Sequence, residues 1–159
     1  MDALRLIRAS RGALARSHDP PDILAEAWQA QALAQAIGSR LAVSGPPELR
    51  GEALGLTEVS GRGCAALDAP DLGVNGIRAA QLTSIEDARI VLLLLGGLLG
   101  EVGIALVGVA CSAGEQADYW QCIEAIDAAD ESRDRVLEML RRLAVREAGM
   151  SAPDSTGGA

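Results

Sequence analysis

The chain has 159 residues, enough for one domain with a buried core, and 49% of them are hydrophobic. Its net charge of −8 repels polyanions and gives no support for nucleic-acid binding. Three cysteines without a CxxC pair, together with a single histidine, His18, argue against a disulfide framework, a thiolate metal site and most acid–base schemes.

Prolines and glycines divide the chain into five segments, with breaks near residues 20, 46, 70 and 114. Between the breaks, apolar residues recur mostly every three or four positions, and the alternating runs typical of strands are lacking. We therefore predict an all-α fold, a four- or five-helix bundle in a single domain over residues 1–148. Residues 149–159 are expected to form a disordered tail.

The first segment, residues 2–17, is a basic helix on an acidic protein. Leu4, Ile7 and Leu14 share one side, and arginines crowd much of the remainder. An arginine-rich helix either binds an acidic partner or pairs with acidic helices of its own fold, and we expect the second. Residues 1–17 also lack the continuous apolar stretch of a secretory signal, so we expect a cytoplasmic protein.

The second and third segments both begin at a Pro-Pro pair, at residues 20 and 46. The second, residues 20–43, presents a stripe rich in small residues, with Trp28 and Leu33 on its flanks: Ile23, Ala27, Ala30, Ala34, Ile37 and Leu41. The third, residues 46–67, contains several glycines and is expected to bend or break near Ser60. Its GxGxxA string follows no predicted strand, so we reject a dinucleotide site.

The fourth segment, about residues 84–112, contains the most apolar stretch of the chain. Thr83 and Glu86 have capping-box spacing at its start, and Glu101 is the one carboxylate within residues 90–111. We predict that this helix is the centre of the bundle, surrounded by the other helices.

The same stretch is long enough to cross a membrane. Against a membrane span, a central carboxylate costs roughly 2.5–3.5 kcal/mol on insertion scales, and the flanks lack a basic cluster. We therefore favour a soluble bundle over a single-span membrane protein.

Glu101 is the main candidate site residue, because a lone buried charge is costly. It shares a helical stripe with Gly97 and Gly108. We expect it to pair with an arginine of the first or second segment, or of a second copy. Two interpretations remain open: a structural ion pair, or the polar anchor of a dimer seam or of an apolar ligand pocket lined by Trp28 or Trp120.

The fifth segment runs from Gly114 to about residue 148. Its predicted core face is the set Tyr119, Ile123, Ile126, Leu137, Leu140 and Ala144. We also predict two ion pairs at four-residue spacing, Glu131 with Arg135 and Glu138 with Arg142.

Acidic residues gather on this fifth segment, and Asp127, Asp130 and Glu131 are weak candidates for a divalent-cation site through oxygen ligands. A solvated charged face explains the same residues more simply. We therefore expect no metal and no other cofactor.

Four stretches carry a resemblance to a known family: EAWQAQALAQAIGS (26–39), SGPPELRGEALGL (44–56), GEVGIALVGVAC (100–111) and YWQCIEAIDAADES (119–132). They resemble an uncharacterised actinobacterial family of small proteins, a domain of unknown function, over most of residues 1–148. The resemblance implies a helical fold in a bacterial cytoplasm, but no activity and no catalytic residues.

The sequence thus favours a non-enzymatic interaction or regulatory protein that forms a homodimer or binds another protein. The first alternative is a bundle that binds a small apolar ligand, with Glu101 as its polar anchor. A metal-dependent enzyme using the acids of the fifth segment and a single-span membrane protein complete the alternatives.

Overall fold

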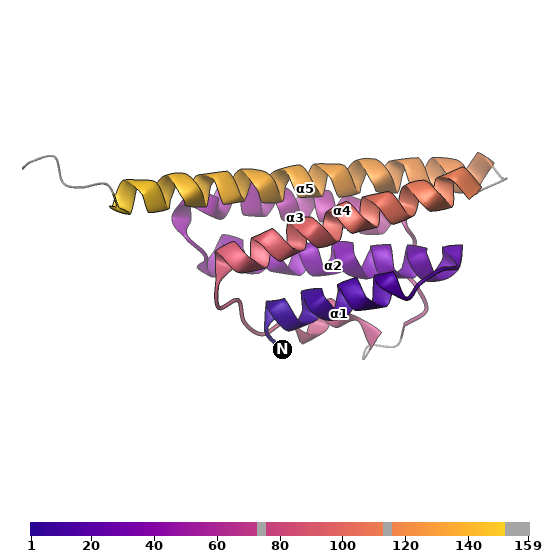
Figure 1. Ribbon diagram of the computed structural model, residues 1–159, viewed down its shortest axis with the longest axis horizontal. Helices are drawn as coiled ribbons and strands as arrows, with labels where there is room; N and C mark the ends of the chain where they lie inside the picture. The colour runs from indigo at the N-terminus through magenta and orange to yellow at the C-terminus, as the bar shows by residue number, and fades with distance from the viewer. Residues whose placement is uncertain (73–75, 113–115, 152–159) are drawn as a thin grey trace, which may run out of the picture.

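A computed structural model of the protein describes residues 1–72, 76–112 and 116–151 (Figure 1). The described part is helical and contains no strand beyond an isolated bridge between Asp2 and Ser84, so the all-α prediction is confirmed. The helices are α1 (Ala3–Ala15), α2 (Pro20–Ser44), α3 (Arg50–Ala66), α4 (Ala88–Ser112) and α5 (Gln116–Ser151), with short 3₁₀ helices η1 (Pro47–Leu49) and η3 (Arg78–Gln81).

Four of the helices form a closed bundle in which α2 packs on α3, α3 on α5, α5 on α4 and α4 on α2. The remaining helix, α1, packs against α2 and α4. Figure 1 shows α5 lying along α3 and α4, with α1 on the opposite side of the molecule. The predicted bundle is therefore present, with α1 added to one of its edges.

The contact between α2 and α3 is close because small residues line it. The predicted α2 stripe is buried from Ala27 to Leu41, whereas Ile23 is half-buried. At Gly38 the two backbones come so near that a Cβ atom would lie 2.7 Å from Thr57 Oγ1 and 2.9 Å from the Ala53 carbonyl oxygen.

The expected break of the third segment near Ser60 is wrong, since α3 is continuous through that position. The Ser60 and Ser132 hydroxyls lie 3.2 Å apart in the core, and Ser132 Oγ donates to Gln31 Oε1 at 3.1 Å. The absent side chain of Gly63 makes room for Gln31, whose Nε2 atom lies 2.7 Å from where a Cβ would stand. Tertiary packing therefore holds as helix a segment that weak propensity alone would break.

The core face of α5 also differs from the prediction. The buried residues are Cys122, Ala125, Ala129, Ser132, Val136, Met139 and Leu143, whereas Tyr119 and Leu137 are 41% and 45% exposed. Small side chains at the centre of this face allow α5 to approach α3 and α4 closely. The larger apolar residues used for the prediction lie at the edges of the contact.

The start of α4 and the end of α5 differ from those predicted from the sequence. The backbone N–H of Ile90 donates to Asp87 Oδ1 at 3.2 Å, which places the cap four residues after Thr83. Thr83 Oγ1 instead accepts a hydrogen bond from the Met1 amine at 2.9 Å. Helix α5 continues to Ser151, beyond the predicted start of the tail; Gly114 and residues 152–159 lie outside the described residues.

The connection between α3 and α4 is anchored by Arg78, a contact that the sequence did not predict. Its guanidinium pairs with Glu26 and donates from Nε to Ser10 Oγ at 3.1 Å. Its backbone N–H donates to Gln29 Oε1 at 3.0 Å. One side chain therefore links this connection to both α1 and α2.

Candidate functional site

Glu101 forms an ion pair with Arg11 at the contact between α4 and α1. Arg11 donates from Nε to Oε2 at 3.1 Å and from Nη2 to Oε1 at 2.5 Å. The hydrogen bond to Glu101 raises the pKa of the Arg11 guanidinium. The prediction of an arginine from the first two segments is confirmed. With side chains 39% and 42% exposed, the pair lies at the surface rather than in the core.

A groove of about 500 Å³ lies beside this pair, between α1 and α4. Its lining is largely apolar and consists of Arg11, Gly12, Leu14, Ala15, Glu101, Ile104 and Ala105. Neither predicted tryptophan lines it: Trp28 packs against the core, and Trp120, 61% exposed, packs edge-on against Tyr119. The structure therefore does not bring Glu101, Trp28 and Trp120 together around one pocket.

Helix α4 is not surrounded, contrary to the prediction. It packs against α1, α2 and α5, and Figure 1 shows no helix in front of it. Along this uncovered side Ile104 is 76% exposed, Leu93 52%, Val107 47% and Ile90 44%. The closed bundle places α3 away from α4, so none of the helices in the described residues covers this side.

Seven residues along this uncovered side have alternating spacings of three and four, and all but the half-buried Gly100 are exposed: Ile90, Leu93, Gly97, Gly100, Ile104, Val107 and Cys111. We call this surface the α4 face. Such spacing is the a/d repeat of a coiled-coil seam, in which one helix packs along another. This repeat was not predicted from the sequence, because an apolar helix with this composition was expected to lie wholly in the core.

The predicted stripe of Gly97, Glu101 and Gly108 lies along the α1 side of the α4 face. Both glycines are exposed, and a Cβ atom on Gly108 would meet nothing within 4 Å. A Cβ on Gly97 would lie 3.6 Å from the guanidinium of Arg11. These glycines therefore form a shallow surface next to the Arg11–Glu101 pair rather than a contact inside the bundle.

By length and composition, α4 also meets the requirements for a membrane span. Half of its most apolar window is buried inside the bundle. One such helix is weak evidence for a membrane span, since the core helix of a soluble protein has the same composition.

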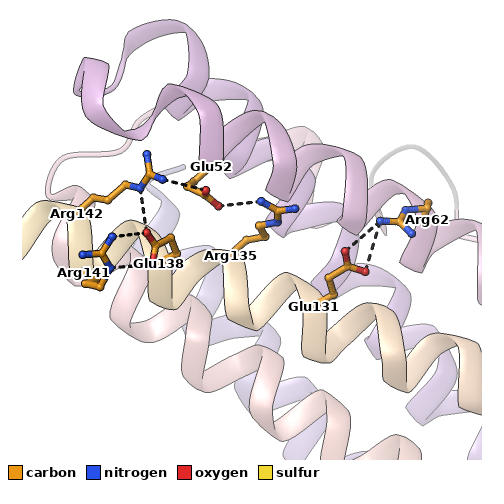
Figure 2. Close-up of polar contacts among 7 residues, drawn as sticks. All are labelled: Glu52, Arg62, Glu131, Arg135, Glu138, Arg141 and Arg142. Atoms are coloured by element: carbon orange, nitrogen blue, oxygen red, sulfur yellow. Dashed lines mark hydrogen bonds and ion pairs between the residues drawn. The ribbon is translucent and has the colours of Figure 1, made fainter.

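A row of ion pairs joins α3 and α5 on a different side of the bundle (Figure 2). Glu52 accepts hydrogen bonds from Arg135 at 3.1 Å and from Arg142 at 3.3 Å. Arg142 also pairs with Glu138, as predicted, at 3.2 Å. The predicted pairing of Arg135 with Glu131 is wrong, because α3 supplies a carboxylate that intrahelical spacing cannot reveal.

Glu138 receives further hydrogen bonds from Arg141, at 2.9 and 2.6 Å. The hydrogen bonds from Arg141 and then Arg142 lower the pKa of the Glu138 carboxyl to about 2. The arginines on this side are thus matched by carboxylates, and the row connects helices of the same chain.

The acidic residues proposed for a metal lie elsewhere on α5. Asp127 and Asp130 are exposed, whereas Glu131 pairs with Arg62 of α3 at 3.4 Å (Figure 2). Within residues 1–72, 76–112 and 116–151, no three histidine, cysteine or acidic side chains are placed to hold a metal ion.

The three cysteines are not joined by disulfides and lie in different surroundings. Burial raises the pKa of the Cys64 thiol to about 11, so this thiol is protonated near neutral pH. Cys122 is buried, and Cys111 is exposed at the end of the α4 face. His18 lies exposed in the connection between α1 and α2.

Fold and surface together define a helical-bundle protein with one uncovered apolar helix face. A family model described as a family of unknown function, DUF6099, matches residues 1–142, and the chain belongs to this family. Neither the curated proteins nor the solved structures contain a match to the chain.

Proposed function

We propose that the protein is a non-enzymatic, cytoplasmic interaction protein that binds another protein chain through the α4 face. The observation that carries the proposal is the exposed row of large apolar side chains on α4, with Ile104 the most exposed of them. Its regular spacing suits an α-helix as the bound element. A protein that regulates its partner through such binding needs no catalytic side chain.

The size of the α4 face fits a protein contact. From their exposed fractions, Ile90, Leu93, Ile104 and Val107 together expose roughly 400 Å² of apolar surface, within the range of about 300–600 Å² for the largest patch on a typical monomer. One partner in a standard interface buries about 800 Å², a little over half of it apolar. The α4 face is therefore large enough for the apolar part of one interface.

Membrane insertion explains the α4 face less well. The other side of α4 carries Val91, Leu95, Leu99 and Leu106, all of which are buried against the rest of the bundle. Withdrawing α4 into a bilayer would expose the apolar residues of α1, α2 and α5 that cover them now, at roughly 25 cal/mol for each Å². A protein partner covers the α4 face without disrupting this core.

The first test measures molar mass by light scattering after size exclusion, without detergent. Each chain has a mass of 16.4 kDa. The wild-type protein is expected to exceed this mass, and Ile104→Asp is expected to return it to that of a monomer. Val43→Asp is the matched control, because Val43 is 83% exposed but lies at the end of α2, and it should leave the mass unchanged.

A second measurement tests whether the α4 face binds a protein other than a second copy of the chain. Ile104→Cys, made in a Cys111→Ser background, is labelled with maleimide in dilute buffer and in cell extract. Slower labelling in extract supports a different protein partner. A monomeric wild-type protein together with equal labelling rates in buffer and extract contradicts the proposed function.

A further inference from the structure

The α4 face has a property that a contact with an unrelated helix does not require: from Ile90 to Val107, leaving out Cys111 at its end, its pattern of large and small residues reads the same in both directions. Two large side chains, Ile90 and Leu93, are followed by two glycines and then by two large side chains, Ile104 and Val107. The centre of the pattern lies between Gly97 and Gly100.

Two antiparallel helices that pack about this centre bring together positions at equal distances from it. Leu93 then lies opposite Ile104 of a second copy, Ile90 opposite Val107, and the two glycines opposite each other. In each of these pairs a residue therefore faces one of similar size. Both members of each pair of large residues are exposed in the single chain. Gly97 and Gly100 place no side chain of α4 at the centre. Their neighbours there are flexible: Arg11 Nη1 lies 3.6 Å from where a Cβ of Gly97 would stand, and Arg133 Nε lies 3.4 Å from that of Gly100. The two backbones approach closely once these arginine side chains turn outward.

Charge is compatible with this arrangement. Glu101 is the one ionisable carboxylate in α4, and it already pairs with Arg11 of its own chain at the edge of the α4 face. A two-fold contact therefore buries no uncompensated carboxylate. Arg89 and Arg133 are exposed beside the α4 face and can keep their guanidinium groups in solvent at the edges of the contact. Antiparallel packing also opposes the two α4 helix dipoles, which is the favourable orientation for neighbouring helices.

We infer that the partner bound by the α4 face is a second copy of this chain, packed with its α4 antiparallel about a centre between Gly97 and Gly100. The inference rests on the proposed function and names its partner. In a parallel dimer each α4 residue would face the same residue of the second copy. Facing residues would then be equal in size for any sequence, so a parallel contact does not require the two-way pattern. A different partner would likewise impose no symmetry on α4. An isologous contact, in which one patch faces its own copy, is the arrangement that requires it.

The test is disulfide cross-linking in a Cys111→Ser background. The double variant Leu93→Cys/Ile104→Cys is expected to form a covalent dimer on mild oxidation, because opposed positions in the contact come within the 3.5–4.5 Å Cβ separation of a disulfide. Ile104→Cys alone is the matched control. In the antiparallel contact its two copies lie roughly 16 Å apart along the helix axis and should not cross-link.

Each outcome decides between the arrangements. Cross-linking of the double variant alone, with a wild-type mass of a dimer, supports the inference. Efficient cross-linking of Ile104→Cys alone indicates parallel helices and overturns it, while leaving the proposed function intact. A monomeric wild-type protein overturns it even if a substitution disturbs folding, since that measurement needs no variant. Recovery of the wild-type chain in detergent only overturns both proposals.

Discussion

Replacing Gly38 by alanine tests the closest helix contact in the bundle. In a helix interior alanine is about 1 kcal/mol more favourable than glycine, so propensity alone predicts a gain in stability. The structure predicts a loss, because the new Cβ would lie 2.9 Å from the Ala53 carbonyl oxygen, whereas such contacts are ordinarily about 3.5–4.0 Å. The Thr57 hydroxyl, at 2.7 Å, can rotate away, but the carbonyl belongs to the α3 backbone and cannot.

The helices α2 and α3 must therefore separate by a few tenths of an ångström, and overpacking of this kind costs about 1–3 kcal/mol. After the gain in propensity is subtracted, we expect a net loss of up to about 2 kcal/mol in place of a gain of about 1 kcal/mol. Urea unfolding followed by circular dichroism at one protein concentration measures this loss. Gly51→Ala on α3 is the control, because a Cβ there meets nothing within 4 Å, and it should be neutral or stabilising. A Gly38→Ala protein about 1 kcal/mol more stable than the wild type, as propensity alone predicts, would refute the close-contact argument.

Three further predictions concern charged and reactive groups. A double-mutant cycle on Arg11 and Glu101 should give a coupling of roughly 0.5–1 kcal/mol that weakens with salt, because both side chains are over a third exposed; coupling above 2 kcal/mol would mean a buried pair. Since the pKa of Glu138 is lowered to about 2, its stabilising contribution is present above about pH 4.5 and is lost as the pH falls through 2. An NMR titration of that carboxyl with a midpoint near 4.5 would contradict this. At pH 7.5 a disulfide reagent should modify the exposed Cys111 fast and Cys64 slowly, because burial raises the pKa of the Cys64 thiol to about 11. A fast phase that remains in the Cys111→Ser variant would contradict the assignment of the fast phase to Cys111.

The fold was predictable wherever local chemistry acts alone. Pro20 and Pro21 set the start of α2 because their fixed backbone angles suit a first helical turn. The cost of an unpaired carboxylate predicted an arginine partner for Glu101, although not that Arg11 would supply it or that the pair would lie at the surface. The core face of α5 was not predictable from large apolar residues, because its buried centre is built from Ala125, Ala129 and Ser132. Small residues contribute little to an apolar pattern but decide how closely helices pack.

The exposure of the α4 face could not be predicted for a different reason. An apolar helix has the same composition whether its whole surface is covered within one chain or part of it awaits another chain. Only the arrangement of the other helices shows that Ile104 and Leu93 are left uncovered. Ion pairs such as Arg135 with Glu52 were hidden for a related reason, since they depend on which helices become neighbours.

The α3–α4 connection, which Arg78 helps to hold, and the helical bundle need not unfold together. In the described parts of the α3–α4 connection, the Arg78 side chain is attached to Ser10 of α1 and Glu26 of α2. The other attachments join mainly backbone atoms of residues 76–84 to Gln29 and to the first three residues of the chain. A connection of this kind can detach and reattach while the helices keep their packing, so its amide hydrogens should exchange at a lower free energy than those of the bundle. Because most of the attachments other than Arg78 use backbone atoms, the connection can vary in sequence around a retained Arg78 without disturbing the helices that it joins.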